Sequence, residues 1–427
     1  MNNLAFSKEL SALDQIEAVT QSLDAEVVGH YRDLRLASHF QPIFSLAHKR
    51  PVGYEALLRA QDQAGHNIPP LAVFNRVQNE EESIFLDRLC RNLHLRNFLP
   101  MADDSSWIFL NINPQVTVAG KRYGSYFGNL LERYQIPPHR IVVEILESNI
   151  HDESLLAEAV DYYKSLGCLV AIDDFGAGHS NFDRIWRLAP QIVKLDRSMI
   201  VQAANNPSVR RVLPNLISLL HESGSMALME GIETEQEALI AMDSGVDFVQ
   251  GYYFGRPKNI LLDPEQNTEV LPELCEKFKH YTKQNAEKHH HELQDYLTTF
   301  QHSAGLIESG VAAELACLTL LDQPKAERCY LLNQEGRQTG CNITSQLRNT
   351  WNDPRFKPLA DASDANWSRR PYFRRAISNP GEVQISRPYL SIAGANMCVT
   401  LSVMVSIGLC NQVLCCDLDW SENAKNP

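Results

Sequence analysis

Short apolar stretches recur between residues 39 and 257, and stretches typical of helices separate most of them. Each apolar stretch has the length of a strand rather than that of a buried helix. The stretch before Asp173 is apolar without alternation, which is typical of a strand buried on both faces of a parallel sheet. The predicted strands are residues 40–44, 51–59, 107–113, 141–147, 169–172, 192–196, 226–230 and 247–250.

Strands that alternate with helices predict an α/β fold class, and eight of them match a TIM-like (β/α)8 barrel. An open, doubly wound sheet is the alternative. It is disfavoured because no glycine-rich phosphate-binding loop follows the first predicted strand. We therefore expect a barrel over residues 29–262, preceded by a polar helical extension over residues 1–28.

Residues 263–310 are expected to form a long connector helix. Leu271, Leu274 and Phe278 follow the spacing of an amphipathic helix, and the spacing resumes at Leu293. It breaks near residues 285–291, which leaves open whether the helix forms a continuous coiled coil. The three consecutive histidines in that break face different sides of a helix and are more typical of a solvated surface than of a metal site.

Residues 311–427 are expected to form a smaller α+β domain. Alternating apolar and polar positions in residues 399–405 and 412–419 predict two strands. The uncharged segment 396–416 has the length of a membrane span, but this alternation and the interrupting Gly408 favour strands. The sequence therefore predicts no membrane span.

The composition is that of a globular protein with ample core, since 44% of the 427 residues are hydrophobic and 21% are charged. The formal net charge is −13 and no long basic tract occurs, which argues against nucleic acid as a main partner. The 10 cysteines are scattered without a metal-binding pair, so we expect reduced thiols in a cytoplasmic protein. Residues 1–28 lack the apolar segment of a signal peptide, in keeping with that location.

Polar side chains lie in or directly after separate predicted strands. In a barrel such positions converge on one face, where the active sites of barrel enzymes lie. Converging acids repel one another unless cations neutralise them, and carboxylate and amide oxygens suit Mg²⁺ or Mn²⁺. Any one of these polar residues could equally be a hydrogen-bonded polar group of the core, whereas their convergence as a set favours a metal site. The converging residues are Glu55, Asn111, Glu144, Asp173, Lys194, Glu230 and Gln250.

Asp173 and Asp174 are adjacent acids at the end of a buried strand. Neighbouring side chains of a strand point to opposite faces, so both acids can serve one site only where the chain leaves the strand. Gly176 and Gly178 permit such a turn. A plain turn with an aspartate helix cap is the alternative interpretation.

Six short motifs stand in order along the predicted barrel. They are Gln41-Pro42-Ile43, Glu55-Ala56-Leu57-Leu58-Arg59, Asp173-Asp174-Phe175-Gly176, Lys194-Leu195-Asp196-Arg197, Glu230-Gly231-Ile232-Glu233-Thr234 and Gln250-Gly251-Tyr252. With these motifs, residues 39–257 resemble the EAL domain, the family of cyclic-di-GMP phosphodiesterases, which is named after the Glu-Ala-Leu tripeptide. A lone Glu-Ala-Leu is common in helices, so the specificity lies in the complete set.

The resemblance implies that one phosphodiester bond of cyclic-di-GMP is hydrolysed to give linear pGpG, with two Mg²⁺ or Mn²⁺ ions as cofactors. The implied metal ligands are Glu55, Asn111, Glu144, Asp173, Asp174 and Glu230. The implied catalytic residues are Glu55, Asp174, Lys194 and Glu230. The implied substrate-binding residues are Gln41, Leu58, Arg59, Gln250, Arg256 and Pro257.

These residue types suit the implied reaction. Two divalent ions activate a water and neutralise the charge that develops on the phosphate. Lys194 is implied to orient the attacking water. The planar guanidinium of Arg59 matches a phosphate in a way that a lysine does not, and Arg256 and Pro257 are implied to lie near a guanine.

The loop after the double aspartate departs from the family pattern. Ala177, His179 and Asn181 stand where the family has Thr, Tyr and Ser, and Leu146 replaces a usual Thr. The resemblance implies that this loop couples dimerisation to metal binding. Its implied anchors are Glu147 and Glu233. The changed loop keeps a second interpretation open, in which a catalytically weak or inactive domain acts as a cyclic-di-GMP receptor.

The C-terminal domain is similar to the PAS-like or Cache-like sensor domain of YkuI-type EAL proteins, most clearly in residues 366–373. Such domains bind small ligands on a central sheet. The candidate ligand residues are Trp367, Arg369, Arg370, Tyr372 and Arg387. The arginines suit a carboxylate or phosphate, and the alternative is that these residues pack and solvate a dimer surface. We expect a homodimer, formed through the barrel and the connector or C-terminal domain, in which an unknown small ligand of the C-terminal domain regulates the barrel.

Overall fold

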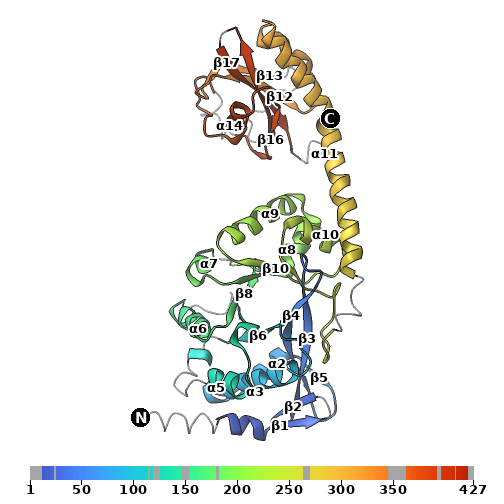
Figure 1. The fold of residues 1–427 in the computed structure, drawn as a ribbon, viewed down its shortest axis with the longest axis vertical. Helices are drawn as coiled ribbons and strands as arrows, with labels where there is room; N and C mark the ends of the chain where they lie inside the picture. The colour runs from blue at the N-terminus through green and yellow to red at the C-terminus, as the bar shows by residue number, and fades with distance from the viewer. Residues whose placement is uncertain are drawn as a thin grey trace. The chain divides into compact units, whose positions relative to one another are not determined.

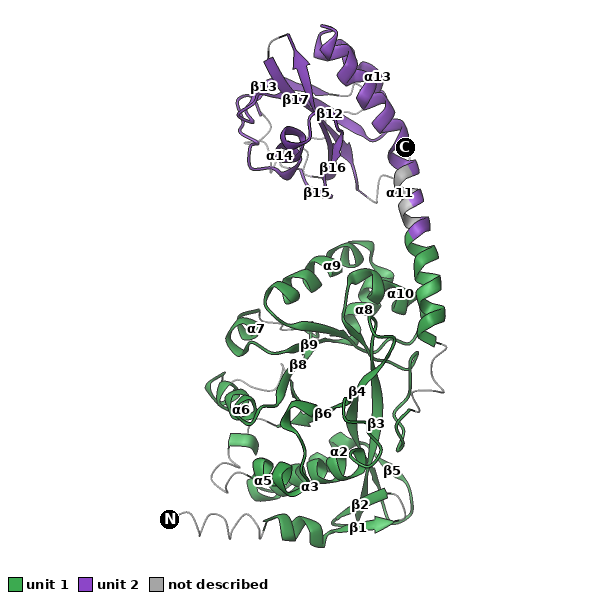
Figure 2. Cartoon of the chain, viewed as in Figure 1, with its two compact units in different colours: residues 1–282 green, residues 283–427 purple. Residues whose placement is uncertain are grey.

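The structure is a computed structural model of the chain, and it divides the protein into two compact units. They span Met1–Thr282 and Lys283–Pro427 (Figure 2). The structure describes residues 12–23, 26–113, 116–118, 126–146, 153–178, 182–262, 270–344, 362–391, 396–408 and 410–421.

The described part of the first unit contains a closed ring of eight strands, which confirms the predicted barrel (Figure 1). The ring closes because β3 pairs with both β4 and β11. Its strands are β3 (Leu34–Ser45), β4 (Arg50–Gln61), β6 (Trp107–Ile112), β7 (Ile141–Leu146), β8 (Leu169–Phe175), β9 (Ile192–Leu195), β10 (Met226–Met229) and β11 (Phe248–Val249).

One strand departs from the regular (β/α)8 pattern. β3 runs antiparallel to both of its neighbours, whereas the other adjacent strands of the ring are parallel. The reason is the short connection between Ser45 and Arg50, which is a turn and leaves no room for a crossover helix. β3 and β4 therefore form a long hairpin within the barrel.

The expected helical extension is wrong from Thr20 onward. Residues 12–18 are helical, but β1 (Thr20–Leu23) and β2 (Glu26–Tyr31) are antiparallel strands, and β2 continues the sheet along β3. Val27, Val28 and Tyr31 favour extended backbone and bury side chains beside the barrel. Ile16 is buried as well, so this segment is packed against the barrel core.

Helices cover the outside of the barrel and bury their apolar faces against its strands. For example, Val193 and Leu195 of β9 belong to the same apolar cluster as Ile200 and Ile217. The helices are α2 (Pro70–Phe74), α3 (Glu80–Phe98), α5 (Tyr126–Arg133), α6 (Glu153–Leu166), α7 (Phe182–Leu188), α8 (Arg197–Asn205), α9 (Pro207–Glu222) and α10 (Glu235–Ser244). Two short elements also lie in this unit, β5 (Asn67–Ile68) and the 3₁₀ helix η1 (Pro138–Arg140).

The second unit is built on a six-stranded antiparallel sheet. Its strands are β12 (Ala326–Leu332), β13 (Gln338–Thr344), β14 (Gln384–Ile385), β15 (Tyr389–Leu390), β16 (Met397–Ile407) and β17 (Cys410–Asp419). The C-terminal part of α11 (Val270–Glu308) and the short helices α12 (Ala313–Ala316) and α13 (Leu318–Leu321) share one apolar cluster with the sheet. Helix α14 (Pro371–Ser378) shares a second cluster with it. This is the smaller α+β arrangement that the pattern predicted.

The uncharged segment 396–416 lies in β16 and β17, as its alternation predicted. Of the helices that the structure describes, none is long and apolar enough to cross a membrane.

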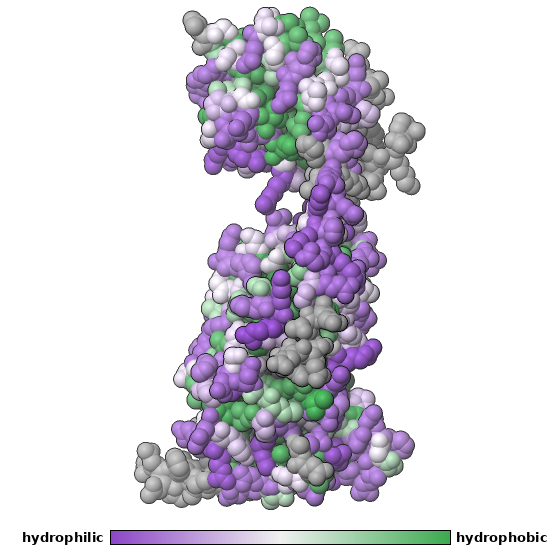
Figure 3. Space-filling view, turned by 45° about the vertical axis from the view of Figure 1, so that its right-hand side comes forward, coloured by the Kyte–Doolittle hydropathy of each residue, from purple (hydrophilic) through white to green (hydrophobic). Residues whose placement is uncertain are grey.

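Helix α11 exposes mostly hydrophilic side chains on the visible face (Figure 3), and exposed ion pairs such as Lys277–Glu273 run along it. Cys415 and Cys416 are buried free thiols, whereas Cys341 and Cys410 are exposed.

Candidate functional site

The alternation of side chains along the strands places the polar residues at one end of the barrel interior. Apolar residues of separate strands fill that interior, and a polar residue follows two positions later on the same face of each strand. The apolar residues are Phe109, Val142, Ala171, Ile192, Leu228 and Phe248. The polar residues that follow them are Asn111, Glu144, Asp173, Lys194, Glu230 and Gln250. β3 runs in the opposite direction, so its Gln41 precedes Ile43 and pairs with Glu55 of β4.

Lys194 lies at the centre of a cluster of acids. Its Nζ lies 2.5 Å from Glu144 Oε1, 2.6 Å from Glu230 Oε1 and 3.2 Å from Asp173 Oδ1. Lys194 and Glu144 are almost fully buried, at 1% and 0% exposure. Water therefore screens these charges little, and the lysine is the cation that holds the acids together in this structure.

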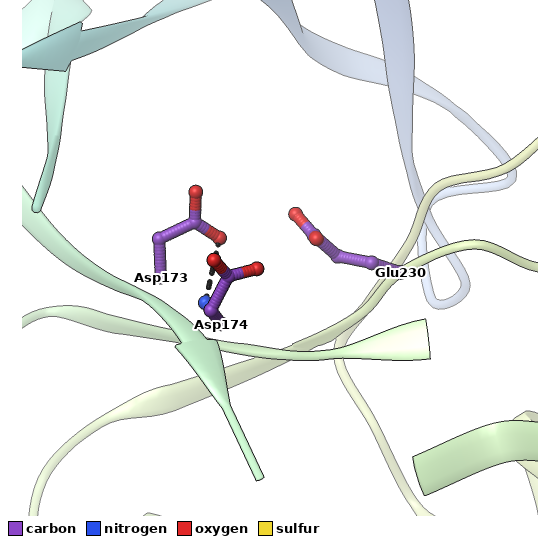
Figure 4. Close-up of side chains that lie close together, drawn as sticks. All are labelled: Asp173, Asp174 and Glu230. Carbon is purple, nitrogen blue, oxygen red and sulfur yellow. Dashed lines mark hydrogen bonds between the residues drawn. The ribbon is translucent and has the colours of Figure 1, made fainter. Parts of the chain in front are cut away.

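Asp173 and Asp174 both face the site because β8 ends in an irregularity. The pairing of β8 with β9 shifts between Ile172 and Phe175, and Asp174 has a φ of 59°. The backbone N–H of Asp174 donates to Asp173 Oδ1 at 2.9 Å. Ligand atoms of Asp173, Asp174 and Glu230 lie within 4.8 Å of one another (Figure 4). Both acids thus belong to one site, and the interpretation as a plain turn is insufficient.

Two amide side chains donate hydrogen bonds to the carboxylate of Glu55 on β4. Gln250 Nε2 donates to Glu55 Oε2 at 2.6 Å and to Gln41 Oε1 at 3.2 Å. Asn111 Nδ2 donates to Glu55 Oε1 at 3.1 Å. The two donors to Glu55 come from β6 and from the residue directly after β11, and they orient its carboxylate.

The pKa shifts reflect an excess of buried acid. Burial raises the pKa of Glu144 well above its usual range and raises that of Glu230 to about 8. Burial and then the neighbouring charge of Asp173 raise the pKa of Asp174. Burial lowers the pKa of Lys194, but the charges of Asp173, Glu144 and Glu230 outweigh it and hold that pKa well above its usual value. The site therefore favours added positive charge.

The residues present fit a divalent cation. Glu144 Oε2 and Gln250 Oε1 are buried acceptors with no hydrogen-bond donor among the described residues. A buried oxygen without a donor is costly, and a cation compensates it. The acids of the cluster offer carboxylate oxygens, the ligand atoms that Mg²⁺ and Mn²⁺ prefer.

A cleft of about 240 Å³ opens beside the cluster, and it contains residues to which the sequence assigned no role. Arg197 lines it and donates to both carboxylate oxygens of Glu233, at 2.6 and 2.7 Å. Tyr252 also lines it, and the centroid of its ring lies 4.2 Å from the guanidinium carbon of Arg256. The positions of Arg197 and Tyr252 at the ends of two family motifs were a signal that could have identified them.

The structure separates some of the predicted substrate-binding residues. Arg59 lies on the same face of β4 as Glu55, and its Nη1 donates to the backbone oxygen of Leu58 at 2.8 Å. The side chain of Leu58 points away from the site into the core, where it is 6% exposed. Glu147, His179 and Asn181 lie outside the described residues.

In the second unit, a small polar cavity gathers part of the predicted ligand set. Trp367, Arg370 and Tyr372 line it, whereas Arg369 and Arg387 are exposed and do not. The guanidinium of Arg370 lies over the ring of Tyr389, 5.2 Å from its centroid. The cavity has a volume of about 20 Å³, which accommodates a single water.

The fold and the site thus define an eight-stranded barrel domain whose acidic cluster lies where the parallel strands of the ring end. The EAL domain model matches residues 26–257, more than half of the 427 residues, and the chain belongs to the EAL domain family.

The chain is also similar to curated proteins and to solved structures. The chain is 28% identical to the EAL-domain containing protein YkuI of Bacillus subtilis over 348 residues, which covers 79% of this chain and 83% of YkuI. The crystal structure of YkuI in complex with its substrate c-di-GMP and calcium matches with a TM-score of 0.76 and 25% identity, over 97% of this chain and 99% of that chain. The cyclic di-GMP phosphodiesterase RocR of Pseudomonas aeruginosa is 25% identical over 256 residues, which covers 59% of this chain and 64% of RocR.

Proposed function

We propose that the protein hydrolyses cyclic-di-GMP to linear pGpG with two divalent ions, Mg²⁺ or Mn²⁺. The observation that carries this proposal is the cluster of oxygen donors from separate strands around Lys194, with buried acceptors that lack a donor among the described residues. Family membership and the similarity to RocR and to the c-di-GMP complex of YkuI support the choice of substrate.

In the proposed site, Glu55, Asn111, Glu144 and Asp173 would hold one ion. Asp173 and Asp174 would hold the second, with Glu230 beside it. When bound, the two ions supply an activated water and neutralise charge on the phosphate. Gln250 Nε2 donates to both Gln41 Oε1 and Glu55 Oε2, and these bonds keep the carboxylate of Glu55 oriented.

Other side chains of the chain would act directly on water and substrate. Lys194 stays protonated in its acidic surroundings and would hydrogen-bond the attacking water. The guanidinium of Arg59 would bind a phosphate of the dinucleotide. Arg256, stacked on Tyr252, would lie beside a guanine. These roles follow the positions of the three residues in or beside the family motifs.

The test is a turnover assay on the purified full chain, with chromatographic detection of pGpG. Production is expected with Mg²⁺ or Mn²⁺ and is expected to cease with a chelator or in Glu55→Ala. Glu132→Ala on α5 is the matched control, because Glu132 is an exposed acid away from the cluster. Absence of pGpG with both metals would contradict the proposal.

A second candidate function is that of a cyclic-di-GMP receptor with little or no turnover. One observation in its favour is that Lys194 forms ion pairs with three acids, so a metal must compete with the lysine for these carboxylates. The other is Ala177, which stands where the family has Thr in the loop after the double aspartate. Calorimetry beside the turnover assay separates the two functions. Tight binding of cyclic-di-GMP without pGpG would establish the receptor.

We also propose that the second unit is a PAS-like or Cache-like sensor domain that regulates the barrel in a cytoplasmic homodimer. Its antiparallel sheet with helices packed against it agrees with this class of domain. Sedimentation analysis tests the dimer, and a monomer at all protein concentrations would contradict it.

A further inference from the structure

A buried ion pair lies on helix α3, outside the acidic cluster, and the proposed reaction assigns it no role. Asp87 and Arg91 are one helical turn apart, and Arg91 Nη2 lies 2.5 Å from Asp87 Oδ2. Both residues are buried, at 8% and 5% exposure. A helix that covers a barrel needs only apolar side chains towards the strands, so a charged pair at this depth requires an explanation.

Stability alone does not explain the pair. Transfer of two charges out of water costs free energy, and apolar residues of similar volume often stabilise a protein equally well or better. The hydrogen bonding of the pair is also incomplete, because Arg91 Nε is buried without an acceptor among the described residues. The pair is better explained by the groups that it holds in place.

The carboxylate of Asp87 holds the end of β6. It accepts a hydrogen bond from the backbone N–H of Asn113, the residue directly after β6. A backbone N–H beyond the end of a strand needs an acceptor from another part of the chain. Asn113 follows Asn111 by two positions, and Asn111 is the residue of β6 that donates to Glu55 of the cluster.

The guanidinium of Arg91 extends this contact to the carbonyl group of the same residue. Its Nη1 donates to Tyr163 Oη of α6 at 2.5 Å. The hydroxyls of Tyr163 and Thr117 lie 3.2 Å apart, and Thr117 Oγ1 donates to the backbone oxygen of Asn113 at 3.2 Å. The backbone N–H of Thr117 donates to that oxygen as well, at 3.0 Å. Tyr163 and Thr117 are buried, so water competes little for these bonds.

We propose that Asp87 and Arg91 are positioning residues, which fix the end of β6 and so set the affinity of Asn111 and Glu55 for a divalent cation. Both backbone groups of Asn113 are held by a network anchored on α3 and α6, and the strand end can move only if that network breaks. The inference rests on the proposed function and adds to it two residues that lie outside the cluster.

The test uses the similar shape of leucine and asparagine. Asp87→Leu/Arg91→Met removes both charges together and leaves neither partner unpaired. Asp87→Asn/Arg91→Met restores an acceptor for the N–H of Asn113. Binding of Mn²⁺ to the full chain is measured by calorimetry. We expect Asp87→Leu/Arg91→Met to raise the Kd for Mn²⁺ by at least about tenfold, because groups that orient a metal ligand typically contribute about 10–100-fold to affinity. Asp87→Asn/Arg91→Met is expected to recover most of this loss.

A turnover assay over a range of Mn²⁺ concentrations separates positioning from a merely structural role. In Asp87→Leu/Arg91→Met, half-maximal formation of pGpG is expected at a Mn²⁺ concentration at least about tenfold above that of the wild type, with kcat at saturating Mn²⁺ reduced by no more than about threefold. A variant with only a damaged fold would lose kcat at every Mn²⁺ concentration.

Tyr163→Phe removes the one hydroxyl between Arg91 and Thr117 and guards against misfolding of the double variants. It is expected to raise the Kd for Mn²⁺ as well. Tyr134→Phe is the matched control, because the hydroxyl of Tyr134 bonds to Asn92 and Glu17 rather than towards the end of β6, and it should leave that Kd unchanged.

The outcomes separate the positioning role from the catalytic function. Wild-type Mn²⁺ affinity in folded Asp87→Leu/Arg91→Met and Tyr163→Phe overturns the inference, and so does an equal loss in the two double variants. Binding of Mn²⁺ without pGpG in the wild type contradicts the catalytic function alone, and the Kd values then decide on the positioning role. Absence of Mn²⁺ binding in the wild type overturns both.

Discussion

At the scale of single residues, Lys194 is the internal counter-charge of the barrel. It contacts three acids whose burial would otherwise leave negative charge uncompensated. Lys194→Met keeps the length of the side chain and removes the charge. We expect turnover to fall by at least about 10²-fold and added Mn²⁺ to raise the unfolding temperature more than it does in the wild type. Equal Mn²⁺-induced shifts in wild type and variant would contradict this role.

His94 makes the stability of the barrel depend on pH. His94 is buried on α3, where its Nδ1 lies 2.8 Å from Ser38 Oγ. Burial, assisted by the charge of Arg59, lowers the pKa of His94 to about 4 from 6.5. Between these values the unfolded chain binds more protons than the folded one. Stability is therefore full above pH 6.5 and falls as the pH is lowered towards 4, by about 3 kcal/mol in total.

The measurement is urea unfolding at several pH values between 4 and 7. His94→Gln is expected to flatten the pH dependence in that window, because a neutral amide takes up no proton. His139→Gln replaces an exposed histidine of η1 and should retain the wild-type slope. A wild-type slope in His94→Gln would show that another group is responsible.

The direction of side chains at the strand ends could be predicted, because side chains on the same face of a strand recur every two positions. Glu144 and Lys194 follow interior residues by two, so the barrel pattern alone directs them inward. The same periodicity explains why the side chain of Leu58 points into the core, since Leu58 is the neighbour of Arg59 on β4 and faces the other side of the strand. The sequence could not show in this way that Arg369 lies outside the cavity of the second unit. Arg369 lies just before α14, so no strand periodicity orients its side chain.

At the scale of elements, the end of β8 depends on one glycine. Gly176 has a φ of 101°, and a Cβ there would lie 2.7 Å from Met199 Cγ. Gly176→Ala is expected to lower the free energy of unfolding by about 1–3 kcal/mol and to displace Asp174 two residues earlier. Unfolding in urea measures the loss of stability. The displacement of Asp174 is expected to make the Mn²⁺-induced rise in unfolding temperature smaller than that of the wild type.

Gly128→Ala is the opposing control for that glycine. Gly128 lies within α5, and its Cβ would meet Leu166 Cδ2 at 3.5 Å, an ordinary contact. An alanine in a helix is expected to stabilise the protein by roughly 0.5–1 kcal/mol. The two glycines should therefore move stability in opposite directions, and destabilisation of similar size in both would refute the conformational explanation.

The alternation of strands and helices predicted the ring, but not the direction of β3 or the strands before it. β3 and β4 are joined by a short turn, and such a turn joins antiparallel strands only. The polar sequence of β1 carries no apolar alternation, and its order comes from pairing with β2. Pairing of this kind depends on the partner strand, which the local pattern does not encode.

At the scale of the whole molecule, the two units have separate cores. Apolar residues of the barrel and of the second unit belong to different clusters, and the boundary between the units falls within α11. The sequence predicted the long helix from its spacing. It did not predict that Arg328 and Asp417 line the small cavity of the second unit, because these two residues lie far apart in the chain.

The buried pair of Arg328 and Asp417 allows the independence of the units to be tested. Arg328 Nε lies 2.8 Å from Asp417 Oδ2, and Asp417 also accepts from Thr400 Oγ1 at 2.7 Å. Asp417→Asn removes the nearer counter-charge of the buried guanidinium and leaves only Glu327, whose Oε2 lies 3.8 Å from Arg328 Nη2. Breaking a buried ion pair by removing one partner typically costs about 3–5 kcal/mol. In calorimetry we expect the unfolding transition of the second unit to move to lower temperature. The unfolding temperature of the transition that cyclic-di-GMP and Ca²⁺ stabilise should equal that of the wild type, because ligand binding stabilises the unit that binds it.

Asp322→Asn is the control, since Asp322 is exposed after α13, and it should move neither transition. A single transition that shifts as a whole in Asp417→Asn would mean that the units unfold together. An altered rate of pGpG formation in the same variant would place regulation of the barrel in the polar core of the second unit.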